Sequence, residues 1–145
     1  MHVVADASVL VEALTDAGNQ ESAAVRRWLA GLVGPDDLHV VRNLTTLEVE
    51  NAMRRLAARG LIAPDDALAV VQRLVELPAR RLDVTQAMTR RIWELRANHS
   101  VYDAAYMALA ERLESELRSP VAVATTDARM GRGGPVPCTI RVFPD

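Results

Sequence analysis

Short apolar segments alternate with longer amphipathic segments along the whole chain. The short segments are rich in β-branched residues and predict strands at 2–5, 38–41, 80–84, 121–124 and 139–142. The longer segments repeat apolar residues every three or four positions and predict helices at 7–14, 20–32, 64–77, 85–97 and 102–117. A further helix is predicted to run to Ala58, with Asn43 or Thr45 as its N-terminal cap. Because strands that alternate with helices form a parallel sheet covered on both faces, we expect an α/β fold.

The length and the cysteine count narrow the class of protein. A chain of 145 residues predicts one domain, 1–145, with a core of its own. Cys138 is the only cysteine, so no internal disulfide can form, and this fits a cytoplasmic location. The apolar segments are too short to cross a membrane and no secretory signal is visible, so we expect neither.

The charged and aromatic residues bear on nucleic-acid binding. The 17 basic and 19 acidic side chains leave a net charge of −2, which argues against sequence-independent coating of nucleic acid. Five aromatic residues are too few to predict a platform for stacked bases: Trp28, Trp93, Tyr102, Tyr106 and Phe143. All basic residues are arginine, and the lack of lysine excludes P-loop, Schiff-base and receiver-domain chemistry.

Two aspartates follow predicted strands directly. Asp6 comes after the strand at 2–5, and Asp127 comes shortly after the strand at 121–124. Ligands of open α/β sheets bind beyond the carboxyl ends of strands, so the two acids meet there if their strands are neighbours. The alternative is local, because Asp6 or Ser8 can cap a helix and Asp127 can cap the following turn.

Asp103 lies in the first turn of a helix that is apolar on nearly every side. Such a helix is buried, so a carboxylate on it needs a partner. The pair Ser100 and Asp103 also has the spacing of a capping box, which is the structural alternative. The two roles are compatible, since a first-turn acid can still point away from the helix.

Two glutamates compete for a place on the helix that ends at Ala58. Glu48 lies roughly 90° from the centre of the apolar stripe, and Glu50 lies roughly 110° away on its other side. Periodicity alone does not choose between them. As isolated residues, both are explained as solvated charges that pair with Arg54 or Arg55.

The carboxylates together predict a chemistry that none of them predicts alone. Carboxylates brought together in a half-buried site repel one another unless a cation neutralises them. Oxygen ligands without thiolate or imidazole favour Mg²⁺ or Mn²⁺. The three histidines, His2, His39 and His99, are scattered and lack the spacing of a zinc site.

Four segments resemble, in order, the motifs of PIN-domain ribonucleases, specifically the VapC-like toxins of toxin–antitoxin pairs. The segments are VVADASVLVEAL, LEVENAMRR, SVYDAAYMALAERL and VATTDARM. The resemblance selects Glu48 over Glu50 and assigns the remaining acids to Asp6, Asp103 and Asp127. Glu50 departs from the family pattern, which has a neutral residue there.

The resemblance implies a three-layer α/β/α fold and an Mg²⁺- or Mn²⁺-dependent endoribonuclease. It also implies a homodimer whose activity is inhibited by a cognate antitoxin protein. Asp6, Glu48 and Asp103 would hold one metal, Asp127 would complete or support a second position, and Ser8 and Thr125 could bind ligand waters or phosphate. Arg96, Arg129 and Arg132 flank the motifs and are candidates for binding RNA.

A PIN-like module without catalysis, binding only RNA or protein, is the alternative function. The four retained acids count against it, because a scaffold has no need of them. A phosphoryl-accepting receiver domain shares acids at strand ends but requires a lysine that this sequence lacks.

The helix at 64–77 carries a wide apolar arc. Its apolar residues cover roughly 160° of the circumference, more than the ~100° that packing on one core demands. Either the helix is deeply set, or its outer flank, with Leu68 and Val75, contacts a second copy of the chain or an antitoxin segment.

Overall fold

The computed structural model describes residues 2–15, 20–32, 34, 36–132 and 134–143. These residues form five strands, β1 (His2–Ala5), β2 (Leu38–Val41), β3 (Arg80–Leu82), β4 (Val121–Thr125) and β5 (Thr139–Val142). They also form six helices, α1 (Ala7–Thr15), α2 (Gln20–Ala30), α3 (Leu44–Ala58), α4 (Pro64–Glu76), α5 (Gln86–Glu94) and α6 (Val101–Leu117). Strands and helices therefore alternate as the sequence predicts.

The strands form one parallel sheet in the order β3-β2-β1-β4-β5. β1 is central, with β2 on one side and β4 on the other, and its residues Val3 and Val4 pair with Ala122 and Val123 of β4. The strand order reverses between β1 and β4, which is where ligand sites of open parallel sheets form. The condition that the strands before Asp6 and Asp127 be neighbours is met.

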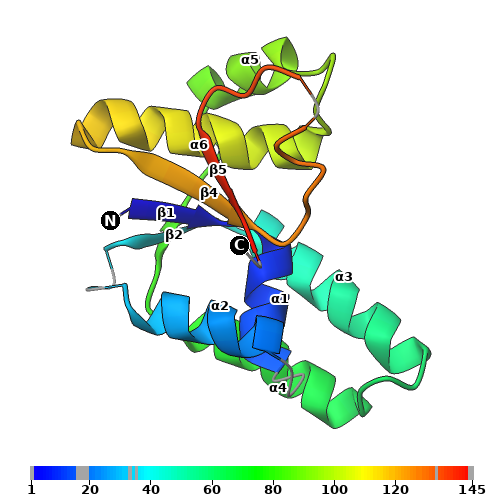
Figure 1. Cartoon of the computed structure of the whole chain (residues 1–145). Coiled ribbons are helices and arrows are strands. Elements are labelled where there is room, and N and C mark those ends of the chain that lie inside the picture. Colours follow the sequence, from blue (N-terminus) through cyan, green and yellow to red (C-terminus); the bar gives the residue numbers. More distant parts are fainter. Residues whose placement is uncertain (1, 16–19, 33, 35, 133, 144–145) are drawn as a thin grey trace.

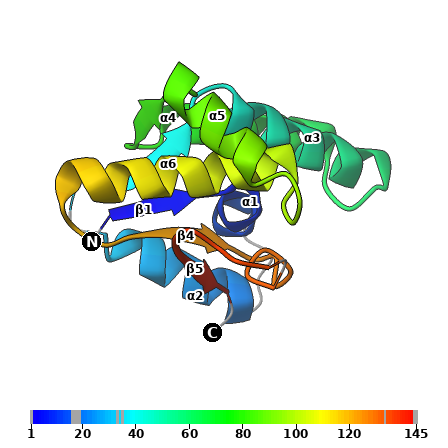
Figure 2. The same cartoon turned by 90° about the horizontal axis from the view of Figure 1, so that it is seen from above.

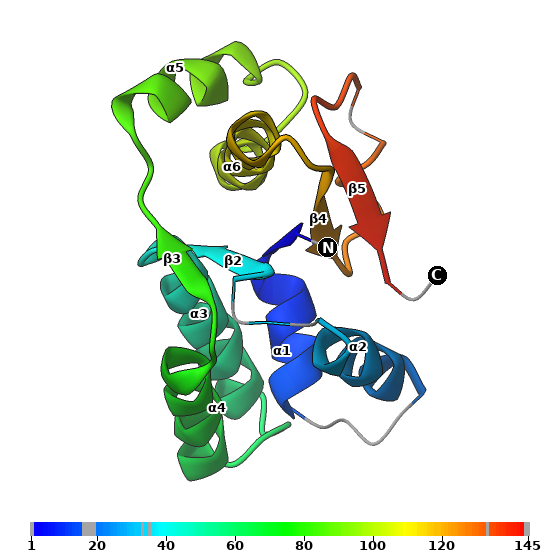
Figure 3. The same ribbon diagram turned by 90° about the vertical axis from the view of Figure 1, so that its left-hand side faces the viewer.

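Helices cover both faces of the sheet and give the predicted three-layer α/β/α arrangement (Figures 1 and 3). α6 covers one face and runs along β1 and β4 (Figure 2), and α5 packs on α6 on the side away from the strands (Figure 3). The other four helices cover the opposite face. Alternate β1 residues supply the two cores, since Val3 packs with α1–α4 and Val4 packs with α5 and α6.

Helix ends differ most from the predictions. The predicted helix at 85–97 ends at Glu94, because the amide of Leu95 bonds carbonyls of the last turn and a series of turns follows. Asn43 is the residue before α3, but with φ 66° it makes no side-chain cap. Thr45 lies inside the first turn, where its hydroxyl accepts a bond from the Val41 amide at 3.1 Å. The capping role predicted for Asn43 or Thr45 is therefore wrong.

α4 buries one face and exposes another. Ala67, Val70 and Leu74 are buried, whereas Leu68 and Val75 are 53% and 61% exposed. The wide apolar arc thus extends beyond the surface that the core covers. Among the described residues, no helix is long and apolar enough to span a bilayer.

Candidate active site

Acidic side chains from four elements meet at the edge of the sheet where β1 and β4 end. Asp6 follows β1, and its amide bonds the carbonyl of Ala124 at 3.1 Å. Asp127 follows β4, Asp103 lies in the first turn of α6, and Glu48 lies in α3.

Asp6 combines the capping role and the site role that the sequence left open. Its Oδ1 accepts the Val9 amide at 3.1 Å and the Ser8 hydroxyl at 2.6 Å, so it caps the start of α1. The side chain is nevertheless buried, and burial raises the pKa of its carboxyl, with a further increase from the charge of Asp103. Burying a carboxylate beside a second acid destabilises the fold, and a capping role alone does not explain it.

Hydroxyl groups tie the loop after β1 to the loop after β4. Ser8 Oγ donates to Asp6 and accepts the Thr126 amide at 2.9 Å. Thr125 Oγ1 lies 3.2 Å from Ser8 Oγ, and a hydrogen bond from the Thr125 hydroxyl also acts to lower the pKa of the Asp6 carboxyl. Thr125 Oγ1 in turn accepts the Asp127 amide at 3.0 Å. Ser8 and Thr125 thus position Asp6 and the Asp127 backbone, a role that the sequence did not predict.

Glu48 is held by a tyrosine that sequence reasoning missed. Tyr106 of α6 is buried and donates its hydroxyl to Glu48 Oε1 at 2.5 Å. Because this uses the phenol proton, Thr45 donates in its 3.3 Å contact with the Tyr106 oxygen. Burial raises the pKa of the Glu48 carboxyl and the charges of Asp6 and Asp103 raise it further, while the Tyr106 bond opposes both.

Tyr106 itself is kept neutral in this environment. Burial raises the pKa of its phenol well above the usual range, and its hydrogen bond to Glu48 adds to the increase. The signal in the sequence was a tyrosine inside an apolar helix, whose hydroxyl requires a buried partner. Nothing in the sequence identified Glu48 as that partner.

Glu50 lies on the other flank of α3 and takes a different partner. Its carboxylate pairs with Arg54 one turn on, at 3.7 Å. Such an exposed i, i+4 pair contributes little to stability and leaves Glu50 away from Tyr106. The structural alternative that the sequence allowed for both glutamates therefore applies to Glu50.

The Ser100 side chain caps α6, because its Oγ accepts the Asp103 amide at 3.1 Å. The helix therefore does not need the Asp103 carboxylate as its only cap. The Asp103 side chain is half-buried, and burial raises the pKa of its carboxyl, followed by the charge of Asp127. The charges of His99 and Arg129 act in the opposite direction. The charge of Asp103 in turn raises the pKa of Asp6 and of Glu48, so Asp103 interacts with all three other acids.

Asp127 is the one acid of the four with a close cationic partner. Arg129 donates to it through its amide at 2.9 Å, Nε at 3.0 Å and Nη2 at 3.1 Å. These bonds lower the pKa of the Asp127 carboxyl. Asp127 thus differs electrostatically from the other three acids, whose pKa values are raised.

The donor set and its charge suit a divalent metal ion. Within the described residues, Asp6, Glu48 and Asp103 make no ion pair with a basic side chain, and only Asp103 is influenced by basic groups, His99 and Arg129. No group of three His, Cys, Asp or Glu side chains is gathered closely enough there to hold a metal as it stands. Glu48 is turned to Tyr106 and Asp127 to Arg129. The residues therefore fit Mg²⁺ or Mn²⁺ in charge and oxygen chemistry, and binding requires side-chain adjustment.

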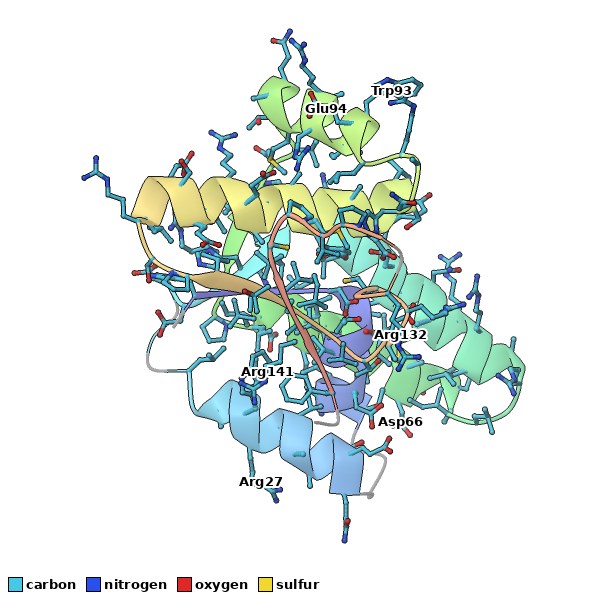
Figure 4. All side chains as sticks on the ribbon, turned by 45° about the horizontal axis from the view of Figure 1, so that its top comes forward. Arg27, Asp66, Trp93, Glu94, Arg132 and Arg141 are labelled. Atoms are coloured by element: carbon cyan, nitrogen blue, oxygen red, sulfur yellow. The ribbon has the colours of Figure 1, made fainter. Side chains whose placement is uncertain are left out.

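An open cavity of about 400 Å³ lies beside these acids, between α1 and α3. Its lining includes Ser8, Glu48, Asn51, Arg55 and Thr126. It brings the Arg55 guanidinium and the Asn51 amide to the acidic edge. Arg132 projects from the loop that follows β4 (Figure 4).

A family model described as PIN domain matches residues 3–134, and the chain belongs to this PIN-domain family. Ribonuclease VapC9 of Mycobacterium tuberculosis is 34% identical over 142 residues, which cover 98% of each protein. Ribonuclease VapC12 of the same organism is 39% identical over 113 residues, covering 77% of this chain and 80% of that protein. The predicted resemblance to VapC-like PIN-domain proteins is confirmed.

Two solved structures share the fold at lower sequence identity. One is VapC20 of Mycobacterium tuberculosis, titled a sarcin-ricin loop cleaving toxin, with a TM-score of 0.62, 19% identity and 94% and 98% of the two chains covered. The other is FitAcB from Neisseria gonorrhoeae, with a TM-score of 0.66, 16% identity and 95% of each chain covered. These likenesses support the three-layer α/β/α fold.

Proposed function

We propose that this chain is a metal-dependent endoribonuclease of the VapC-like toxin type, with Asp6, Glu48, Asp103 and Asp127 as its catalytic and metal-binding residues. The observation that carries the proposal is the convergence of four acids from separate elements at the sheet's topological switch point. Three of these acids have raised pKa values and no basic partner among the described residues. The ribonuclease names of the similar proteins support an RNA substrate.

The protein's own groups would prepare the site for Mg²⁺ or Mn²⁺. Bound there, the metal would supply an acidified water as nucleophile and would offset charge on the leaving oxygen. Asp6, Glu48 and Asp103 would hold the ion, and Asp127 would complete or support a second position. Ser8 orients Asp6, Tyr106 orients Glu48, and Arg129 keeps Asp127 ionised.

The proposal extends to partners and location. We expect a cognate antitoxin protein to inhibit the activity, and two copies of this single domain, 1–145, to form a homodimer. We also expect the reaction to take place in the cytoplasm. The exposed apolar flank of α4 supports a protein contact on the face opposite α6.

Asp6→Asn and Asp103→Asn test the catalytic assignment. Purified protein with Mg²⁺ or Mn²⁺ should cut RNA, and EDTA should stop the cutting. Each substitution removes a ligand charge without removing volume, so the rate should fall on the order of 100-fold or more as several kcal/mol of stabilisation is lost. Gel analysis of end-labelled RNA measures the rate, and circular dichroism checks the fold.

Asp66→Asn is the matched control, because Asp66 is an exposed aspartate on α4. It should cut RNA at the wild-type rate. If Asp6→Asn and Asp103→Asn also cut as well as wild type, the site is misplaced. Wild-type protein that binds RNA without cutting it in any divalent metal would favour the alternative, a PIN-like binding module.

A further inference from the structure

Two exposed aromatic side chains flank the connection between α5 and α6. Trp93 is 65% exposed in the last turn of α5, and Tyr102 is 53% exposed in the first turn of α6. Figure 4 shows Trp93 projecting from α5 above the start of α6. An exposed indole is costly in water, because it leaves a large apolar surface wet. The structure thus exposes an aromatic group on each side of this connection, although the number of aromatic residues in the sequence did not predict a platform.

Arg96 lies against this indole and has no acidic partner. Its guanidinium carbon is 4.5 Å from the centre of the Trp93 ring, and its Nη1 donates to the Trp93 carbonyl at 3.0 Å. Among the described residues, no carboxylate lies within ion-pair distance of Arg96. Arg90 and Arg91 of α5, in contrast, pair with Glu94. One charge of this region is therefore free to bind an anion.

The connection between α5 and α6 leads into the proposed catalytic edge. Tyr102 directly precedes Asp103, and the charge of the neighbouring His99 acts on the Asp103 carboxyl. The ring Nε2 of His99 also lies 3.1 Å from the carbonyl of Pro135, which joins this turn to the segment after β4. A polymer that follows this connection away from the acidic edge would reach Trp93.

An indole, a phenol and an unpaired guanidinium are the groups that bind single-stranded nucleic acid. Bases stack on aromatic rings and on guanidinium planes, and the arginine charge pairs with phosphate. An apolar protein segment would instead require an aliphatic groove, such as the one that Met53, Ala57, Leu68 and Val71 line between α3 and α4. Charge and chemistry both favour RNA at Trp93.

We propose that Trp93, Arg96 and Tyr102 form a base-stacking subsite that holds an unpaired nucleotide next to the bond that is cut. This proposal rests on the proposed ribonuclease function and assigns part of its RNA contact. The indole stacks on the base, Arg96 binds an adjacent phosphate, and Tyr102 continues the surface toward Asp103. These are positioning residues, so they act on RNA binding and on KM more than on kcat.

Binding of a fluorescein-labelled single-stranded RNA in EDTA tests the subsite without cleavage. Trp93→Ala should weaken binding about 10-fold, because stacking of one base contributes about 1–3 kcal/mol. Trp93→Phe should restore most of the affinity. Arg96→Gln should weaken binding and reduce the slope of log K against log salt by about 0.7, the value for one phosphate contact to a single strand. RNA should also quench wild-type tryptophan fluorescence more than that of Trp93→Phe, which retains Trp28.

Leu61→Ala and Arg59→Gln are matched controls at the connection between α3 and α4, on the opposite side of the sheet. Leu61 is 64% exposed, close to the value for Trp93, and Arg59 is likewise exposed. Both controls should bind RNA as wild type does. With Mg²⁺ or Mn²⁺, Trp93→Ala should raise KM and leave kcat nearly unchanged.

The outcomes separate the subsite from the function. If wild type cuts RNA and Trp93→Ala matches it in both affinity and KM, the subsite is wrong and the ribonuclease stands. If wild type neither binds nor cuts RNA in any divalent metal, the proposed function fails and the subsite fails with it. If Trp93→Ala changes only the oligomeric state in sedimentation, the patch is a protein contact and the proposal is overturned.

Discussion

Individual acids in this protein perform structural and chemical roles together. Asp6 caps α1 through the Val9 amide and still lies buried beside Asp103. Ser100 supplies a cap to α6, so the Asp103 carboxylate can face the other acids. The sequence offered capping as the alternative to a site for both residues. The structure contains the caps and brings the acids together as well, so capping does not argue against a site here.

The choice between Glu48 and Glu50 gives a direct test at this scale. Glu48→Gln should reduce RNA cleavage on the order of 100-fold, because it removes a ligand charge and alters the bond from Tyr106. Glu50→Gln should change cleavage less than about twofold, because it breaks only an exposed pair with Arg54 of small energy. Initial rates at saturating Mg²⁺ measure both variants.

A Glu50→Gln variant that loses more activity than Glu48→Gln would contradict the assignment. The sequence could not decide this question by periodicity, since the two glutamates lie at similar angles from the apolar stripe of α3. The deciding contact comes from Tyr106, which is far from Glu48 along the chain and becomes its neighbour only when α6 packs against the sheet. Only the resemblance to the family selected Glu48 in advance.

At the scale of elements, strands were predicted more accurately than helix ends. β1, β2 and β5 have the predicted bounds, because a short apolar run between polar residues defines a buried strand. α5 is shorter than predicted, since Leu95 continues the apolar period although the helix has already ended at Glu94. Periodicity records which side chains face the core and does not record where helical hydrogen bonds end.

β2 contains a histidine that should make stability depend on pH. His39 is fully buried, its Nε2 lies 3.4 Å from Nδ1 of His2, and its own Nδ1 has no hydrogen-bond partner among the described residues. Burial lowers the pKa of His39 to about 4, and the charges of Arg80 and His2 add to the decrease. The charges of Asp37 and Asp36 oppose it. The folded protein therefore keeps this imidazole neutral.

Because the folded pKa lies below the unfolded value of 6.5, the unfolded chain binds a proton that the folded chain does not. The contribution of His39 to the free energy of unfolding is fully present above pH 6.5 and is lost as the pH falls toward 4. The loss is about 3 kcal/mol at most. Urea unfolding at pH 7 and pH 5 measures it, and His39→Val should have a smaller dependence. The acids at the other end of the sheet affect the pH dependence of unfolding in the opposite direction. They are present in both proteins, so their effect cancels when the two pH dependences are subtracted. Equal dependence in the two proteins would contradict this account.

The whole molecule determines which predicted elements become neighbours. The sequence predicted parallel strands with helices on both faces, and it predicted that Asp6 and Asp127 meet only if β1 and β4 are adjacent. The order β3-β2-β1-β4-β5 makes them adjacent. This order depends on how α1 and α6 pack on opposite faces of β1, which is a property of long-range contacts. The local pattern could therefore place each acid at a strand end but could not bring the acids together.

The exposed flank of α4 gives the last prediction, which concerns assembly. Leu68 and Val75 are separated by two helical turns, so they lie on one side of the helix, and both are exposed beside the buried Ala67 and Leu74. A second copy of the chain that packs there would remove this apolar surface from water. Leu68→Glu together with Val75→Glu should convert a dimer to a folded monomer, because two charges cannot be buried in an apolar interface without partners.

Sedimentation velocity at tens of micromolar, with circular dichroism as the check on folding, measures this change. Gln72→Glu is the matched control, because it adds a carboxylate to another exposed position of α4 and should leave the dimer intact. Wild-type protein that is already monomeric would contradict the prediction. So would a double variant that unfolds, since unfolding would mean that Leu68 and Val75 support the domain's own core. A folded monomer with full RNA-cutting activity would show that each copy carries a complete site, as expected when all four acids come from one chain.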